Sequence, residues 1–189
     1  MVSTIKIAIR FTLVTTLLLG LIYPLAVTAF AHFFLRDKAN GQLLMRNGHV
    51  AGSAILGQSF TGDTYFHSRP SAAGNGYDAA NSSGSNLALS NKKLIDRIQG
   101  DVAAYQKSAP GQAVPIDLVT ASGSGLDPDI TPAAALYQVH RVAEARHLSD
   151  DAVRQLVLAH VQGRQFGILG EPRVNVLALN LALDEAAVK

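Results

Sequence analysis

A long, mostly apolar segment near the start of the chain predicts a membrane-spanning helix. Residues 11–35, FTLVTTLLLGLIYPLAVTAFAHFFL, carry no formal charge and are bracketed by Arg10 and Arg36. A helix of that length rises about 37 Å, whereas the hydrocarbon core of a bilayer is about 30 Å thick. We therefore expect a short tail at residues 1–10, a single transmembrane helix at 11–35 and a soluble domain at 36–189.

A cleaved signal peptide is the alternative interpretation, because residues 29–31 (AFA) resemble a small-x-small cleavage site. Apolar regions of signal peptides are about 7–15 residues long and are followed by polar residues. Here the chain stays apolar through residues 33–35, beyond that site, which favours a retained anchor. The positive charges on the two sides of the span are nearly balanced, so they do not decide its orientation.

Four residues recur at every fourth position of the span: Thr12, Thr16, Gly20 and Pro24. This spacing places them on one helical face. Small residues let a second helix approach closely, and a proline is tolerated where neighbours satisfy the freed carbonyl group. We expect this face to pack against a partner. The alternative is that threonine and glycine are simply common in membrane helices.

Beyond residue 36, short alternating segments and helical stripes predict an α+β fold with a small mixed sheet. Asn47-Gly48 between apolar runs predicts a β-hairpin within residues 41–57. The later elements that we expect are a helix at 91–107 with Ser90 as its N-cap, a strand at 114–120, a helix from Pro132 to Arg146 capped by Thr131, a helix capped by Ser149 and stopped by Gly163, and a strand at 174–176 followed by strand or helix at 177–183.

Residues 68–90, SRPSAAGNGYDAANSSGSNLALS, interrupt this pattern. Twelve of these twenty-three residues are Ser, Asn or Gly, as in a flexible linker. The helix that follows would make a poor domain by itself, so we interpret the segment as a long ordered loop. Arg69, Tyr77 and Asn86 are expected to hold it in place.

Composition removes several classes of function. The chain has no cysteine, which excludes disulfides, thiolate metal sites and a cysteine nucleophile. Lys6 and Arg10 account for the formal charge of +2, because from Arg36 onward fourteen Lys and Arg residues balance fourteen Asp and Glu. A neutral domain without a basic stripe gives no electrostatic sign of nucleic-acid binding.

Candidate catalytic and metal-binding motifs are weak. Ser90 and Lys93 match the S-x-x-K motif of penicillin-recognising enzymes, but the sequence lacks the K-T-G-like strand that this chemistry needs. A membrane-anchored serine hydrolase is therefore a remote alternative. His140, Glu144 and His147 are spaced like metal ligands, yet no fourth ligand is near, so we interpret them as a polar helix flank. The residues alone predict no catalytic group, metal site or bound cofactor.

Three long blocks of sequence carry a resemblance to a known family. They are GQSF…YFHSRPSAAGNGYDAANSSGSNLALSNKKLIDRI, VPIDLVTASGSGLDPDITPAAALYQVHRVAEAR and GEPRVNVLALNLALD. In this order, after a single N-terminal span, they closely resemble the C subunit of the bacterial potassium-transporting Kdp ATPase, a P-type pump. The resemblance covers essentially the whole chain. SSGSN at residues 82–86 is a small departure, because the family usually has a glycine pair before Ser-Asn.

The resemblance implies a non-catalytic subunit of a complex in the bacterial inner membrane, needed for an assembled and active pump that transports potassium. The implied partners are a channel-like A subunit, an ATP-hydrolysing B subunit, the small F subunit and membrane lipid. One family role is a catalytic chaperone that raises the ATP affinity of the B subunit by binding ATP in its own Ser/Gly-rich segment. The other is an extracytoplasmic domain resting on the A subunit near the potassium entrance. The two roles conflict if the domain lies outside, because it cannot then reach cytosolic ATP. We favour the second role, because the sequence has no recognisable phosphate loop and its neutral domain does not attract anions strongly.

Candidate subunit contacts lie in two loops and comprise Arg69, Tyr77, Ser85, Asn86, Asp127 and Asp129. The small polar residues of the first loop suit close backbone contact with a neighbouring subunit. Asp127 and Asp129 are also candidates for weak cation contact near the ion entrance, although Asp-Pro-Asp is equally typical of a turn.

Overall fold

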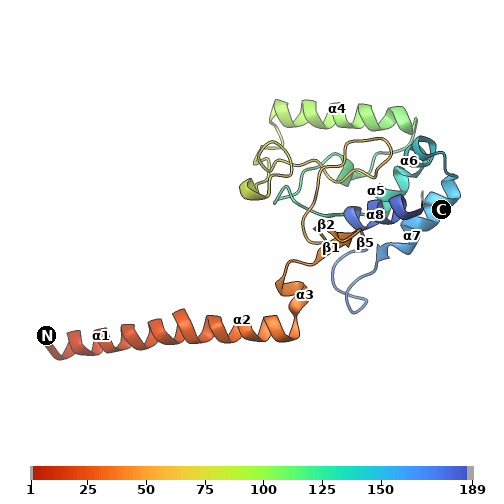
Figure 1. Cartoon of the computed structure of the whole chain (residues 1–189). Helices are drawn as coiled ribbons and strands as arrows, with labels where there is room; N and C mark the ends of the chain where they lie inside the picture. Colours follow the sequence, from red (N-terminus) through yellow and green to blue (C-terminus); the bar gives the residue numbers. More distant parts are fainter. Residues whose placement is uncertain (1, 187–189) are drawn as a thin grey trace. The chain divides into compact units, whose positions relative to one another are not determined.

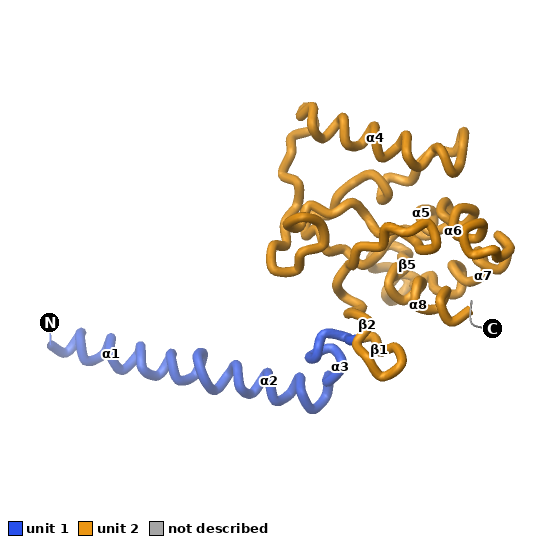
Figure 2. Tube along the Cα trace, turned by 45° about the horizontal axis from the view of Figure 1, so that its top comes forward, with its two compact units in different colours: residues 1–43 blue, residues 44–189 orange. Residues whose placement is uncertain are grey.

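The computed structural model describes residues 2–186 and divides the chain into two compact units, residues 1–43 and 44–189 (Figure 2). The first unit holds one long helix, built from α1 (Val2–Leu17), the π-helical turn η1 (Leu18–Ile22) and α2 (Tyr23–Phe34). The short helix α3 (Arg36–Ala39) follows. Within the described residues, Val2–Phe34 is the one helix long and apolar enough to cross a bilayer. The residues before the apolar span are helical as well, from Val2 onward.

The π-helical turn lies directly before Pro24. A proline lacks the backbone N–H that the carbonyl of Gly20 would otherwise accept from. The chain responds by widening: the N–H of Tyr23 bonds to the carbonyl of Leu18, five residues back. This keeps the helix continuous through the proline, as is common for π-bulges in helices.

The second unit begins with the hairpin of β1 (Leu43–Arg46) and β2 (His49–Ser53), which form a two-stranded sheet (Figure 1). Asn47 and Gly48 join the strands with φ of 51° and 79°. A two-residue turn with both φ values positive matches the twist of the paired strands, which is why Asn-Gly favours it. The predicted hairpin is confirmed.

A three-stranded antiparallel sheet has the order β3 (Asp129–Ile130), β5 (Arg173–Asn175) and β4 (Val161–Gln162). Ile130 and Val161 both pair with Val174 of the central strand. Four helices lie around it: α5 (Pro132–Tyr137), α6 (Val139–Arg146), α7 (Asp150–Ala159) and α8 (Val176–Ala186) (Figure 1). The core packs aliphatic side chains of these elements around Phe66, which is fully buried. The predicted α+β class is confirmed.

Two buried amide side chains hold the segment around Phe66 in this core. Asn180 accepts from the N–H of Phe66 at 2.9 Å and donates to its carbonyl at 3.0 Å. Gln138 does the same for His67, at 2.8 and 3.2 Å. The two amides replace a neighbouring strand, so the backbone groups of a buried irregular segment are satisfied.

The helix α4 (Lys92–Ser108) was predicted one residue too early and with the wrong cap. The N-cap is Asn91, whose side chain accepts from the N–H of Lys93 at 2.9 Å. Ser90 lies before it in a turn closed by the bond from Asn91 N–H to the carbonyl of Ala88. Both residue types cap helices well, so the path of the preceding turn decides between them.

The strand predicted at 114–120 is wrong: this segment contains the 3₁₀-helix η3 (Ile116–Leu118). Both the N–H and the hydroxyl group of Thr120 bond to the carbonyl of Ile116, which turns the chain back on itself. A second 3₁₀-helix, η2 (Ala79–Asn81), lies within the Ser/Gly loop, with Asp78 as its cap.

The last three helical segments differ in detail from the predictions. The helix predicted from Pro132 to Arg146 has its Thr131 cap but divides at Gln138, whose side chain accepts from the N–H of His67. The helix capped by Ser149 ends at Ala159 rather than Gly163, because β4 must already be extended to pair with β5. The ambiguous segment 177–183 is helical, with Asn175 accepting from the N–H of Ala178 at 3.0 Å.

Candidate functional site

The two Ser/Gly loops of the sequence pack against each other in the second unit. The first loop is residues 68–90 and the second is residues 120–127. The hydroxyl group of Ser71 donates to the carbonyl of Gly125 at 2.6 Å, and the N–H of Ser83 donates to the carbonyl of Ser124 at 2.9 Å. The two loops therefore form one ordered surface, which we call the loop pair.

Glycine is required where the loops approach most closely. Gly125 has φ of 68°, and a Cβ atom there would lie 2.7 Å from the backbone of Ala73 and of Ser83. Such a distance is far inside van der Waals contact, and the left-handed backbone is itself unfavourable for other residues. In the same loop, the carbonyl of Leu126 accepts a hydrogen bond from the N–H of Gly57 at 2.8 Å.

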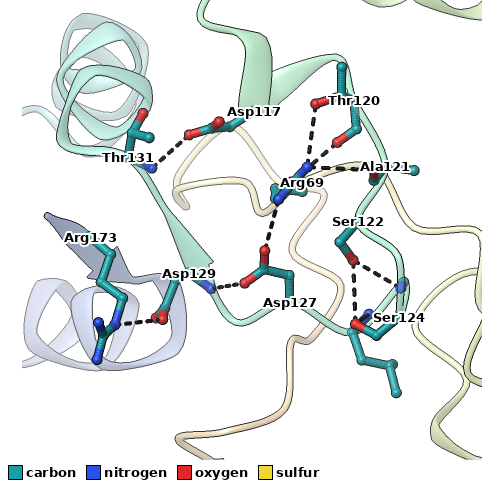
Figure 3. A network of polar contacts seen from close by, with 12 residues as sticks. Arg69, Asp117, Thr120, Ala121, Ser122, Ser124, Asp127, Asp129, Thr131 and Arg173 are labelled. Carbon is teal, nitrogen blue, oxygen red and sulfur yellow. Dashed lines mark hydrogen bonds and ion pairs between the residues drawn. The ribbon is translucent and has the colours of Figure 1, made fainter. Parts of the chain in front are cut away.

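Arg69 is the centre of the loop pair (Figure 3). Its guanidinium group forms an ion pair with Asp127 at 2.9 Å. It also donates to the carbonyl of Thr120 at 3.3 Å and to that of Ala121 at 3.5 Å. The planar fork of an arginine suits such simultaneous bonding, so one side chain fixes the first loop to the second.

Tyr77 secures the other side of the same segment. Its hydroxyl group donates to the carbonyl of Arg69, and its N–H donates to the hydroxyl of Ser71 at 2.8 Å. Its φ of 57° reverses the chain at this point. A tyrosine hydroxyl is protonated at neutral pH and can donate this bond, and burial raises the pKa of the Tyr77 phenol further from that range.

Asp127 and Asp129 connect the loop pair to the sheet. Asp127 accepts from the N–H of Asp129 at 3.1 Å, as expected of Asp-Pro-Asp turn chemistry. Asp129 pairs with Arg173 of β5 at 3.0 Å and accepts from the amide of Asn175 at 3.1 Å. Burial is the main cause that raises the pKa of Asp129, against the opposing effects of Asn175 and Arg173.

A cleft of about 280 Å³ opens beside these residues. It is lined by four carboxylates and two guanidinium groups, those of Asp117, Asp127, Asp129, Glu171, Arg69 and Arg173. Acidic groups outnumber basic ones in this lining, and the ion pairs of Asp127 and Asp129 with the two arginines offset part of the negative charge. Among residues 2–186, no three His, Asp or Glu side chains gather closely enough to hold a metal ion.

Ser85 and Asn86 do not join this network in the way the other predicted contacts do. Both side chains are exposed, on the stretch that leads to α4. Asn86 has φ of 50°, so it bends the backbone there. Of the six predicted contact residues, the structure thus brings Arg69, Tyr77, Asp127 and Asp129 together.

Serine hydroxyl and backbone N–H groups of the loop pair bond mainly to each other. The hydroxyl of Ser122 accepts from the N–H of Gly125 at 2.9 Å, and that of Ser124 accepts from the N–H of Leu126 at 3.1 Å. The hydroxyl of Ser71 accepts from two further N–H groups. A phosphate-binding loop instead directs such donors toward the ligand.

A second polar cluster, which the sequence does not predict, lies around Asp184 of α8. Its carboxylate bonds to Arg146 at 2.7 Å, to Arg46 of the hairpin at 2.5 Å and to the hydroxyl of Tyr65 at 3.3 Å. The guanidinium group of Arg146 also lies over the Tyr65 ring, 4.7 Å from its centre. The cluster holds the hairpin against α6 and α8. Its residues are far apart in the sequence, so no short motif predicts it.

A larger cleft of about 580 Å³ lies between α4 and the segment around His67. Asp63, Asp101, His67, Lys107 and Arg141 contribute charged or titratable groups, so its lining has mixed polarity. Burial lowers the pKa of His67, which favours a neutral ring at neutral pH. Arg141 already donates to the carbonyl of Asp63 at 2.7 Å.

The remaining motif residues do not form a catalytic arrangement with one another. Ser90 precedes α4 and Lys93 lies in its first turn, and both are exposed. His140 pairs with Asp150 at 3.1 Å, whereas His147 ends α6 in a left-handed conformation.

The π-helical turn lies within the predicted packing face of the first unit. A Cβ atom on Gly20 would lie 3.8 Å from the Thr16 side chain, so these two residues share a face. In a straight α-helix, positions four apart drift round the axis, because each turn holds 3.6 residues. The wider turn at Leu18–Ile22 offsets part of this drift before Pro24.

Comparison with known proteins identifies the family. The family described as "KdpC: K+-transporting ATPase, c chain" matches residues 5–185. A "Potassium-transporting ATPase KdpC subunit" from Koribacter versatilis (strain Ellin345) is 59% identical over 177 residues, covering 94% of this chain and 92% of the relative. The same subunit of Acidobacterium capsulatum is 56% identical over 181 residues, covering 96% and 97%. That of Bradyrhizobium diazoefficiens is 52% identical, with both chains covered in full. The chain therefore belongs to the KdpC family, the c chain of K+-transporting ATPases.

Proposed function

We propose that the chain is a non-catalytic accessory subunit of the potassium pump, required for its assembly and activity. Its soluble unit lies outside the cytoplasm and contacts the potassium-translocating subunit through the loop pair. The ATP-hydrolysing subunit and the small F subunit complete the complex. Membership of the family supports a place in the pump, and the apolar helix supports a place in the membrane.

The order of the loop pair is the observation that carries this proposal. Segments rich in Ser, Gly and Asn normally lose much conformational entropy when they bind. Here Arg69, Tyr77 and Ser71 have already fixed the loop, so binding a partner costs little further ordering. Small side chains also allow the backbone to approach a neighbouring protein closely.

The chaperone role, in which the Ser/Gly segment binds ATP, is the second candidate. It would require the hydroxyl group of Ser71 to leave the carbonyl of Gly125, and the N–H groups of Gly125 and Leu126 to leave the hydroxyls of Ser122 and Ser124. Each lost internal hydrogen bond costs about 1 kcal/mol. We therefore favour the contact role, in which the loops keep these bonds. The acidic cleft beside Asp127 and Asp129 would supply weak attraction for cations near the potassium entrance.

Co-purification with the tagged translocating subunit tests the assembly role. Gly20→Ile places a branched side chain on the packing face beside Thr16, and we expect it to abolish co-purification. Leu19→Ile, one residue away on another face, is the matched control and should co-purify normally. Retention of Gly20→Ile at the wild-type level would remove the packing face from the proposal. Failure of the wild-type chain to co-purify would overturn the assembly role itself.

A further inference from the structure

The connection between β4 and β5 ends in an exposed apolar tip. Phe166, Ile168 and Leu169 are 91%, 74% and 54% exposed. The loop that carries them is the blue segment below β5 in Figure 1. Three large apolar residues so close together in water mark a contact site, because their burial is favourable.

The loop is built to keep this tip exposed. Gln165 and Leu169 exchange two backbone hydrogen bonds, each of 2.9 Å. Arg164 and Glu171 close the base with an ion pair of 2.6 Å. Phe166 has φ of 53°, an unfavourable conformation that persists only where surrounding bonds impose it. A flexible loop would fold such a ring back onto the protein surface.

The short connection between α2 and the second unit, which we call the tether, limits which surroundings the apolar tip can contact. Only residues 35–43 separate the end of α2 from the start of the second unit, and four of them form α3. Five extended residues and one helical turn span about 25 Å at most. A unit of this size has a radius of gyration of about 15 Å. Chain connectivity therefore keeps its surface within reach of the bilayer that holds the apolar helix.

The position and chemistry of the loop favour lipid over protein. The amide of Asn175, at the end of β5, donates to the carbonyl of Ala54 at 2.9 Å. The strand that carries the loop thus lies against the segment that follows the tether. The base of the loop carries the ion pairs Arg164–Glu171 and Arg173–Asp129, so it is charged where the tip is apolar, and this division suits the boundary between headgroups and acyl chains. A convex tip enters a bilayer without a preformed pocket, whereas a protein partner must supply one.

We propose that the tip Phe166–Leu169 inserts into the interfacial region of the bilayer and gives the subunit a second membrane contact. The apolar side chains enter the acyl boundary, and the arginines at the base remain at headgroup level. This inference goes beyond the proposed function and does not depend on it, since it requires no other subunit.

The chain has no tryptophan, so a single introduced one reports its own surroundings. The full chain carrying Phe166→Trp is reconstituted into phosphatidylethanolamine–phosphatidylglycerol vesicles with and without brominated acyl chains. We expect its emission to shift to shorter wavelength and to be quenched by the brominated lipid. Leu89→Trp is the matched control, because Leu89 is also 91% exposed and leads into α4, on the opposite side of the unit in Figure 1. Its emission should be quenched by aqueous iodide and not by the lipid.

Two results overturn the proposal. Identical behaviour of the two variants, both open to iodide and both insensitive to brominated lipid, would show that the tip stays in water. Shielding of Phe166→Trp that develops only when the other pump subunits are added, without quenching by lipid, would assign the tip to a protein contact. Both side chains point into solvent, so neither substitution disturbs the core.

Discussion

Arg69 and Asp127 lie 58 positions apart in the chain and form an ion pair of 2.9 Å that holds the loop pair together. Their side chains are 25% and 30% exposed. Because the pair is partly buried, solvent and salt screen its charges less than those of a surface pair. The additional bonds from Arg69 to Thr120 and Ala121 make the contact depend on geometry as well as charge.

Arg69→Lys should destabilise the second unit even though it keeps the charge. An ammonium group cannot reach Asp127, Thr120 and Ala121 at once, as the planar fork does. We expect the free energy of unfolding to fall by about 1–2 kcal/mol, measured by thermal unfolding of the full chain in detergent. Lys92→Arg, in the exposed pair with Asp96, is the control and should leave the midpoint unchanged. Equal effects of the two substitutions would contradict the bridging role of Arg69.

Gly125→Ala should disrupt the loop pair. The new methyl group would overlap the backbone of Ala73 and Ser83, and its φ of 68° is unfavourable for alanine. Together these effects should cost at least about 2 kcal/mol of unfolding free energy. Gly123→Ala, two residues away, meets no atom within 4 Å and should be tolerated. The comparison is read from the thermal midpoints of the two variants, and similar midpoints would show that the loops are not closely packed.

The carboxylate of Asp184 predicts a specific sensitivity to acid. Burial opposes its ionisation, but the hydrogen bonds and charges of Arg146 and Arg46 outweigh burial, so its pKa lies below the usual value. The Asp184 carboxylate becomes protonated at about pH 4 in the unfolded chain, and only at lower pH in the folded chain. The stabilisation is therefore complete above pH 4 and is lost as the pH falls through the folded pKa.

Asp184→Asn should accordingly lower the thermal midpoint at about pH 7 and have little effect below the folded pKa. Asp96→Asn removes the same charge from an exposed ion pair and serves as the control. If Asp184→Asn lowers the thermal midpoint equally at about pH 7 and below the folded pKa, ionisation of Asp184 does not contribute to stability.

The proposed orientation predicts that the soluble unit is open to protease outside the cell. Protease added to intact spheroplasts should digest residues 44–189 while cytoplasmic proteins survive. Protection in intact spheroplasts, with digestion after permeabilisation, would move the unit to the cytoplasm. That result would make binding of ATP by the Ser/Gly loop physically possible again.

Elements fixed by neighbouring residues could be predicted from the sequence. The turn at Asn47-Gly48 and the caps at Thr131 and Ser149 need only side chains and backbone a few positions apart, and all three are present. The strand predicted at 114–120 is wrong because tertiary contacts override local propensity. Asp117 turns inward to accept from the N–H of Thr131 at 2.7 Å.

The candidate site could be predicted only in part. Arg69 and Tyr77 were expected to order the first loop, but their acceptors lie in other segments or on the same turn, and no short motif reveals them. The bond between Arg46 and Asp184 joins residues 138 positions apart. Such pairings are set by the fold as a whole, so they leave no local pattern in a single sequence.

Potassium uptake by cells that lack this chain tests the central claim most directly. A deletion strain should fail to accumulate potassium from micromolar medium, and expression of the wild-type chain should restore uptake. Ser90→Ala should restore it equally, and the purified chain alone should hydrolyse no ATP. Normal uptake in the deletion strain, under conditions where the pump is its sole potassium transporter, would contradict the account.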